Sequence, residues 1–216
     1  MNLFFTNLIL EIVIQEYNVI YFMKIFLVPL GSNCSTTKIL IDVLKLRLER
    51  NPFEWNTCNN LKKVIDLLKN KFDNFLRKDQ IPIMSSNEEF AFKNDYDMLF
   101  NHEAQKNSEN NKWEINEKIR DEIFEKYNRR ILRTLQKINE AEKIIFFRFV
   151  PEYYFVPEGN IHNFPKKTNK ENQDTLNELK NIYRKKNIEC IYVNNIEQMQ
   201  NFINYINSLK ENNTFI

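Results

Sequence analysis

Glycine is almost absent from this chain of 216 residues, which contains only Gly31 and Gly159. Average usage of about 7% would give roughly fifteen. Gly31 lies between the apolar run 25–30 and a segment whose apolar residues have helical spacing. A chain that keeps one of its two glycines at a strand-to-helix turn needs that backbone there, either for a positive φ or for the close approach of a second group. We therefore predict that the turn from Gly31 to Ser35 is the active turn.

Cysteine and histidine are also rare. The three cysteines form no CxxC pair, and the two histidines complete no zinc-ligand spacing. An odd, sparse cysteine count is not typical of a secreted disulfide framework. We therefore expect no metal, no cofactor and a reducing, cytoplasmic location. The cysteines are Cys34, Cys58 and Cys190, and the histidines are His102 and His162.

Neither sign of charge predominates, because the chain has 31 Lys and Arg residues and 29 Asp and Glu residues, which gives a net charge of +2. Such a balance produces no overall field that favours nucleic acid or an acidic membrane surface. Asn, Lys and Ile are very frequent, a bias typical of an AT-rich coding genome. We therefore do not interpret the Asn and Lys clusters as functional.

No uninterrupted apolar run in the first 30 residues reaches the length of a membrane span, because Glu11, Glu16 and Lys24 interrupt it. A basic leader and a small-residue cleavage site are missing, so a signal peptide is not expected. Met23 opens a strand pattern and is a possible true start. Residues 1–22 are then an N-terminal extension, for example an added amphipathic helix, and residues 23–216 form a single predicted domain.

Strand and helix patterns alternate along the rest of the chain. Helices are predicted over 36–48, 59–76, 115–138, 171–186 and 196–209, and strands over 23–28, 143–150 and 188–193, with weaker strand candidates at 81–84, 89–92 and 98–100. Polar loops are expected at 105–111 and 151–168. This order predicts a layered α/β fold, Rossmann-like or SGNH-hydrolase-like, with a mainly parallel central sheet.

Ligands of parallel sheets bind beyond the carboxyl ends of the strands, where both the Gly31 turn and Arg148 are expected. Cys34 would sit at the N-terminus of the next helix, where unpaired N–H groups and the helix dipole favour a thiolate. The same N–H groups, with Ser32 and Asn33 beside them, could hold an oxyanion. The alternative is that Cys34 packs as a small hydrophobe.

A base for this thiol has two candidates. His102 follows a strand candidate at the edge of a polar loop, and His162 lies in an aromatic, proline-flanked loop and ranks second. Glu103 and Glu54 are the acids that could orient an imidazole. The alternatives are a solvated loop histidine and surface or helix-capping carboxylates.

The remaining candidates would bind substrate. Arg148, at the end of a buried strand, needs a carboxylate or a substrate anion as its partner. Arg129 and Arg130 either neutralise substrate or belong to an ordinary solvated helix face. Trp55 either lines a pocket or plugs the core. Cys58 and Cys190 are interpreted as structural.

Five segments, in order, carry a family resemblance: Leu30-Gly31-Ser32-Asn33-Cys34-Ser35, Asn51-Pro52-Phe53-Glu54-Trp55, Phe100-Asn101-His102-Glu103, Lys126-Tyr127-Asn128-Arg129-Arg130-Ile131 and Phe146-Phe147-Arg148. This set resembles the DUF1796 family, labelled putative papain-like cysteine peptidases. Glutamate stands at 54 and 103 where that family has aspartate. The resemblance implies Cys34 as nucleophile and His102 as base, and we take "papain-like" as a statement about chemistry rather than fold.

These observations lead to three functional hypotheses. The first is a cysteine-dependent hydrolase acting on an acyl bond, peptide or isopeptide. The second is a transferase or binder of an anionic ligand, such as a phosphate or sugar nucleotide, held by the Gly31–Ser35 turn with Arg148 and Arg129 or Arg130. The third is a catalytically inactive interaction protein. The expected partner is a peptide or small-molecule substrate rather than nucleic acid or a membrane.

Overall fold

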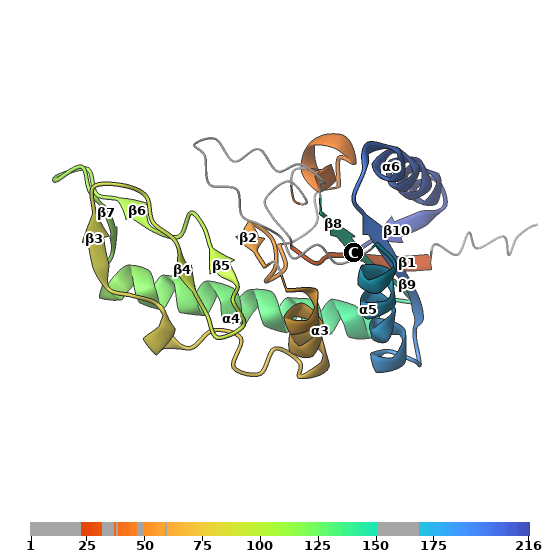
Figure 1. Ribbon diagram of the computed structural model, residues 1–216, viewed down its shortest axis with the longest axis horizontal. Helices are drawn as coiled ribbons and strands as arrows, with labels where there is room; N and C mark the ends of the chain where they lie inside the picture. Colours follow the sequence, from red (N-terminus) through yellow and green to blue (C-terminus); the bar gives the residue numbers. More distant parts are fainter. Residues whose placement is uncertain (1–22, 32–36, 38, 47–49, 59, 151–168) are drawn as a thin grey trace, which may run out of the picture.

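A four-stranded parallel sheet forms one end of the molecule (Figure 1). The computed structural model describes residues 23–31, 37, 39–46, 50–58, 60–150 and 169–216. The sheet has the order β10-β1-β8-β9, and every neighbouring pair runs parallel. Its strands are β1 (Met23–Pro29), β8 (Lys143–Phe149), β9 (Asn187–Val193) and β10 (Asn213–Phe215). The predicted α/β class with a mainly parallel sheet is confirmed.

Alternation of side chains divides the two central strands between two apolar clusters. Phe26 and Val28 of β1 join Phe146 of β8 in one cluster. Ile25 and Leu27 belong to the other, on the opposite face of the sheet. Burial on both faces explains why these strands are nearly continuous apolar runs in the sequence.

Helices lie on both sides of these strands (Figure 1). The first cluster contains residues of α3 (Leu61–Lys69), α4 (Glu117–Glu140) and α5 (Asn169–Ile182). The second contains residues of the short π-helix η1 (Ile39–Val43) and of α6 (Ile196–Lys210). The more specific Rossmann-like or SGNH-hydrolase-like arrangement and the single-domain boundary at 23–216 stay predictions.

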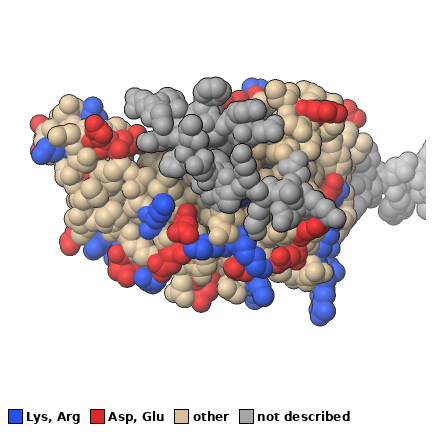
Figure 2. All heavy atoms as spheres, in the orientation of Figure 1, with Lys and Arg blue, Asp and Glu red and all other residues tan. Residues whose placement is uncertain are grey.

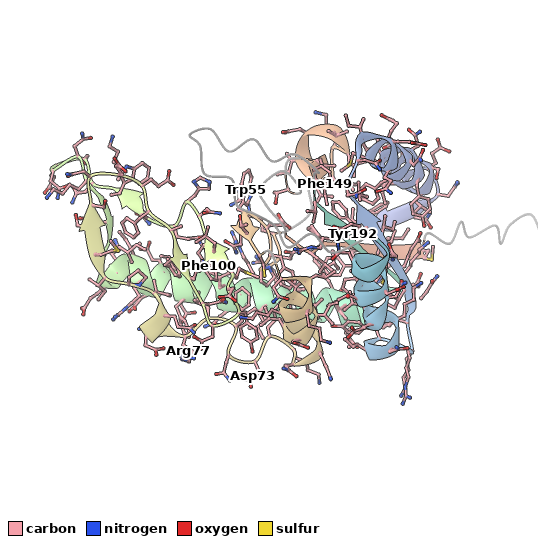
Figure 3. All side chains as sticks on the ribbon, in the orientation of Figure 1. Trp55, Asp73, Arg77, Phe100, Phe149 and Tyr192 are labelled. Atoms are coloured by element: carbon pink, nitrogen blue, oxygen red, sulfur yellow. The ribbon has the colours of Figure 1, made fainter. Side chains whose placement is uncertain are left out.

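Two small antiparallel sheets lie along α4, away from the parallel sheet (Figure 1). One has the order β2-β5-β4, with β2 (Asn56–Thr57), β4 (Phe92–Lys93) and β5 (Leu99–Phe100). The other has the order β3-β7-β6, with β3 (Met84–Ser86), β6 (Gln105–Lys106) and β7 (Trp113–Ile115). A single turn of 3₁₀-helix, η2 (Lys78–Gln80), precedes β3. Phe100 of β5 packs edge-on against Tyr127 of α4, which anchors the first small sheet to the helix (Figure 3).

Four elements differ from the sequence-based predictions. In place of an α-helix over 36–48, the described part of that range contains the π-helix η1. The helix predicted over 59–76 ends at Lys69, because the left-handed backbone of Lys71, Phe72 and Asn74 breaks the helical repeat. The expected loop 105–111 begins with strand β6, and the short β10 was not predicted.

Surface charges agree with the balanced composition. On the described part of the face in Figure 2, Lys and Arg side chains alternate with Asp and Glu along the lower edge, without an extended patch of one sign. Among the described helices, none has both the length and the sustained hydropathy needed to cross a lipid bilayer.

Candidate active site

Gly31 follows β1 and lies directly against the backbone of a turn formed by residues 51–58. A Cβ atom at Gly31 would lie 2.3 Å from the carbonyl oxygen of Phe53 and 3.1 Å from that of Asn56. The N–H of Cys58 donates to the Gly31 carbonyl at 3.3 Å. The φ of Gly31 is outside the left-handed region, so of the two predicted reasons for this glycine, the close approach of a second group applies.

Thr37, on the other side of the predicted active turn, contacts the same 51–58 turn. Its side chain is buried, and its Oγ1 accepts a hydrogen bond from the Trp55 N–H at 3.3 Å. Gly31 and Thr37 thus bracket residues 32–36 and both pack on one segment. Ser32, Asn33, Cys34 and Ser35 lie outside the described residues, so their predicted roles stay predictions.

A buried asparagine shapes the 51–58 turn. The Asn51 Oδ1 accepts from the N–H groups of Phe53 at 2.8 Å and Glu54 at 3.2 Å, and its Nδ2 donates to the Pro29 carbonyl at 3.4 Å. The Glu54 Oε1 accepts from the Asn51 N–H at 3.0 Å. Trp55 then adopts a left-handed φ of 66°. These bonds tie the turn to the end of β1.

Glu54 is a buried carboxyl group, 5% exposed. Burial raises its pKa from 4.5 to about 7, although the Asn51 N–H and the charges of Arg130, Arg50 and Lys137 oppose the shift. Its described hydrogen bond runs to the backbone of its own turn. Glu54 thus holds the turn together, and a role in orienting an imidazole stays a prediction.

Arg148, at the carboxyl end of β8, joins the Gly31 side of the site to the 51–58 turn. Its Nη1 donates to the Leu30 carbonyl at 2.7 Å and its Nη2 to the Cys58 carbonyl at 2.6 Å. Arg148 thus contacts the residue before Gly31 at the carboxyl ends of β1 and β8, where it was expected. Its partners in the described chain are backbone carbonyls rather than the expected carboxylate, and a contact with substrate stays a prediction.

Glu103 takes part in a buried network on α4. The Tyr127 Oη lies 2.8 Å from the Glu103 Oε1 and 3.1 Å from the Asn56 Oδ1, and Lys126 forms an ion pair with the same carboxylate. Asn56 also donates from Nδ2 to the Pro52 carbonyl at 2.8 Å. The network fastens the 51–58 turn to the long helix.

His102 follows β5, which pairs with β2 at the end of the 51–58 turn. Its imidazole is 60% exposed, and its Nδ1 lies 2.7 Å from the Glu89 Oε1. The neighbouring Asn101 donates from Nδ2 to the Thr57 Oγ1 at 3.1 Å, which holds this segment beside β2. The acid that contacts the imidazole is therefore Glu89, and Glu103 contacts Tyr127 and Lys126 instead.

The two arginines predicted on α4 have different surroundings. Arg129 is exposed, as expected of a solvated face. Arg130 is 5% exposed, and its guanidinium carbon lies 5.0 Å from the centre of the Tyr127 ring. The guanidinium carbon of Arg50 lies 6.0 Å from the centre of the Trp55 ring. Trp55 itself lies beside β2 (Figure 3).

Comparison with known families decides the relationship of the chain. A family model described as putative papain-like cysteine peptidase (DUF1796) matches residues 26–187. The chain belongs to the DUF1796 family. The resemblance inferred from the five ordered motifs is thereby confirmed. No curated protein and no solved structure matches the chain.

The description of the DUF1796 family calls for a reactive thiol, and two of the three cysteines are poor candidates. Cys58 is buried, its Sγ lies 3.6 Å from the Asn60 carbonyl oxygen, and burial raises its pKa. Burial likewise raises the pKa of Cys190 to about 11. Both thiols are thus protonated at neutral pH, which leaves Cys34 as the cysteine to test.

Several residues of this DUF1796 site were missed in the sequence. Asn51 and Tyr127 fall within two of the five motifs, but neither was assigned a role, and Asn56 was not singled out in a chain rich in asparagine. All three side chains are buried and hydrogen-bonded. The predicted competing base, His162, lies outside the described residues. Among the residues that are described, no group of His, Cys, Asp and Glu side chains could hold a metal ion.

Proposed function

We propose that this protein is a cysteine-dependent hydrolase of an acyl bond, peptide or isopeptide, with Cys34 as nucleophile and His102 as base. One observation carries the proposal: the exposed His102 imidazole contacts the Glu89 carboxylate through Nδ1 and follows the strand that pairs with the end of the 51–58 turn. That turn packs on Gly31 and Thr37, the residues on either side of 32–36 in the sequence. Membership of the family described as putative papain-like cysteine peptidase supports the same chemistry.

Glu89 is the proposed orienting acid. With Nδ1–H directed to the Glu89 Oε1, the neutral imidazole keeps its lone pair on Nε2. That nitrogen is free to take a proton from a thiol. The carboxylate also stabilises the imidazolium that forms.

The reaction proceeds in two displacements. The Cys34 sulfur attacks the substrate carbonyl carbon while the His102 Nε2 takes the thiol proton. The tetrahedral intermediate collapses to a thioester as the scissile bond breaks and the leaving amine receives that proton from His102. Water then attacks the thioester, gives a proton to His102, and releases the acid product and the Cys34 thiol. Backbone N–H groups of the Gly31–Ser35 turn, with Ser32 and Asn33, are the proposed oxyanion donors.

Alkylation by iodoacetamide tests the nucleophile. At neutral pH we expect Cys34 to react faster than Cys58 and Cys190, as located by mass spectrometry of the native protein, and Cys34→Ala to remove the fast phase. Faster labelling of Cys58 or Cys190 would overturn the assignment. In His102→Gln, the pH dependence of Cys34 labelling should move up to that of an ordinary thiol, with a pKa of about 8.5.

A pair of substitutions tests the acid. Glu89→Gln should change the pH dependence of Cys34 labelling, because it removes the carboxylate beside His102 Nδ1. Its exposed neighbour supplies a matched control, Glu88→Gln, which should leave that pH dependence unchanged. If Glu103→Gln changes the pH dependence more than Glu89→Gln does, the acid has been assigned incorrectly.

A further inference from the structure

Two cations of α4 contact the ring of Tyr127, and among the described residues only Lys126 has an anionic partner. The Lys126 Nζ lies 5.3 Å from the ring centre and the Arg130 guanidinium carbon lies 5.0 Å from it. Lys126 forms an ion pair with Glu103. The Nη1 of Arg130 is fully buried and has no hydrogen-bond partner, and no described carboxylate lies within ion-pair distance of its guanidinium.

A buried guanidinium without a partner is energetically costly, so its retention needs a reason. The Tyr127 ring compensates only part of this cost, because the buried Nη1 has lost its water without gaining an acceptor. The carboxylate whose charge Arg130 influences, Glu54, is half protonated near neutral pH, since burial raises its pKa to about 7. The cluster of Arg50, Lys126 and Arg130 with Glu54 and Glu103 therefore has an excess of positive charge.

We propose that Arg130 binds a carboxylate of the substrate, the side chain of an aspartate or glutamate close to the scissile bond. This inference rests on the proposed function, because Arg130 contacts the Tyr127 ring and Tyr127 is bonded to Asn56 of the 51–58 turn, which packs on Gly31 and Thr37. A guanidinium pairs with a carboxylate through two parallel hydrogen bonds. A monoanion suits the cluster better than a doubly charged phosphate, which Glu54 and Glu103 would repel.

Binding to the full-length Cys34→Ala protein tests the inference without any chemistry. The probes are the blocked tripeptides acetyl-Ala-Asp-Ala-amide and acetyl-Ala-Glu-Ala-amide, their Asn and Gln counterparts, and inorganic phosphate. At millimolar concentration we expect the acidic peptides to raise the melting temperature by about 2–4 °C and the amide peptides to have no effect.

Two substitutions in the Cys34→Ala protein test whether Arg130 is the residue that binds the peptide carboxylate. Arg130→Met keeps the apolar contact with Tyr127 and should abolish the acidic-peptide shift. Its melting temperature without peptide should equal or exceed that of the parent, which a purely structural arginine would not allow. Arg184→Met removes an exposed arginine that precedes β9, at the amino end of the sheet, and should keep the full shift.

Four results would overturn the inference: no shift from any peptide, equal shifts from the acidic and amide peptides, a shift from phosphate but not from the acidic peptides, or a lower melting temperature of unliganded Arg130→Met. Its failure is distinguishable from failure of the hydrolase proposal, because iodoacetamide labelling of Cys34 is measured separately. Fast labelling of Cys34 with no preference for acidic peptides would support the hydrolase proposal and contradict the role of Arg130. A preference for acidic peptides without fast labelling would support the anion site and contradict the hydrolase proposal.

Discussion

Two buried arginines of this protein solve the same electrostatic problem in different ways. Arg148 is 2% exposed at the end of β8, and its two terminal nitrogens donate to the carbonyls of Leu30 and Cys58. Arg130 is 5% exposed on α4, where it contacts the Tyr127 ring and its Nη1 has no acceptor. Burial lowers the pKa of the Arg148 guanidinium, and the carbonyl contacts compensate for the lost water.

The difference separates a structural cation from a binding cation. Around Arg148, three chain segments meet: the end of β1, the end of β8 and the 51–58 turn. Its hydrogen bonds are satisfied within the protein, so it stabilises that junction. Around Arg130, the described residues provide a ring and distant charges but no acceptor for Nη1, which is why we propose a ligand carboxylate as its partner. Replacing Arg148 by an apolar side chain should therefore destabilise the protein, whereas the same replacement of Arg130 should not.

The largest expected effect comes from removing the hydrogen bonds of Arg148 to the Leu30 and Cys58 carbonyls. Arg148→Met should lower the free energy of unfolding by about 3–5 kcal/mol, because it leaves two buried carbonyls without donors. Urea denaturation followed by circular dichroism measures it. The exposed-site control, Arg184→Met, should stay within about 0.5 kcal/mol of the wild type. If Arg148→Met costs no more than Arg130→Met, the two arginines are equivalent and the comparison fails.

The second-largest expected effect is the pH dependence of stability that comes from Glu54, whose carboxylate interacts with the charge of Arg130. The pKa of Glu54 is about 7 in the folded protein, above its ordinary 4.5, so the folded state holds this proton more tightly than the unfolded state. The stabilisation from this group is therefore complete below about pH 4.5 and is lost as pH rises through about 7. Its ceiling is about 3 kcal/mol, since one pKa unit corresponds to about 1.4 kcal/mol.

Urea titrations at several pH values between 4.5 and 8 measure this loss. Glu54→Gln should remove it, whereas the exposed-site control Glu140→Gln should keep it. In Arg130→Met the loss should become larger, because the Glu54 carboxylate then has one fewer neighbouring cation. A wild-type profile as flat as that of Glu54→Gln would contradict the raised pKa.

A third substitution tests the close approach at the Gly31 turn. Gly31→Ala should reduce the free energy of unfolding by about 1–3 kcal/mol, because the new Cβ would meet the Phe53 carbonyl oxygen at 2.3 Å. The same shift of backbone should slow alkylation of Cys34. An unchanged melting temperature together with an unchanged labelling rate would show that Phe53 does not approach Gly31 in solution.

The smallest expected effect concerns the network that fastens the 51–58 turn to α4. Tyr127→Phe should cost about 1–2 kcal/mol, because Asn56 and Glu103 lose a buried partner. The Tyr96 hydroxyl donates to the Asp73 carbonyl at an exposed position, so Tyr96→Phe provides the matched control with a smaller cost. Equal losses in chemical denaturation would mean that the Tyr127 network adds nothing beyond an ordinary surface hydrogen bond.

Much of the parallel sheet was predictable from the sequence. The run that forms β8 is apolar on both faces, and it was predicted at 143–150 against the observed Lys143–Phe149. The helix predicted at 115–138 is observed as Glu117–Glu140, because its apolar residues recur over six turns. The strand β10 has three residues, two of them polar, so no periodicity could indicate it. It forms because β1 offers an unpaired edge.

The candidate site was predicted less completely. The approach of Arg148 to the Gly31 turn was predictable, because carboxyl ends of parallel strands meet at one edge of a sheet. The acid beside His102 was not, since the weak strand pattern at 89–92 does not indicate that Glu89 meets a residue 13 positions away. Asn51 and Asn56 were hidden by the frequency of asparagine, and Tyr127 by its place among apolar residues on α4.

The sequence by itself determined the α/β class, the place of Gly31 at the end of the first strand and the DUF1796 motifs, because these depend on local composition and residue order. Only the tertiary structure decided which partners the polar side chains meet. His102 meets an acid 13 residues away, and Arg148 meets carbonyls 118 and 90 residues away. Such contacts depend on how irregular segments fold back on the sheet and α4, and the same folding buries Arg130 without an acceptor for its Nη1.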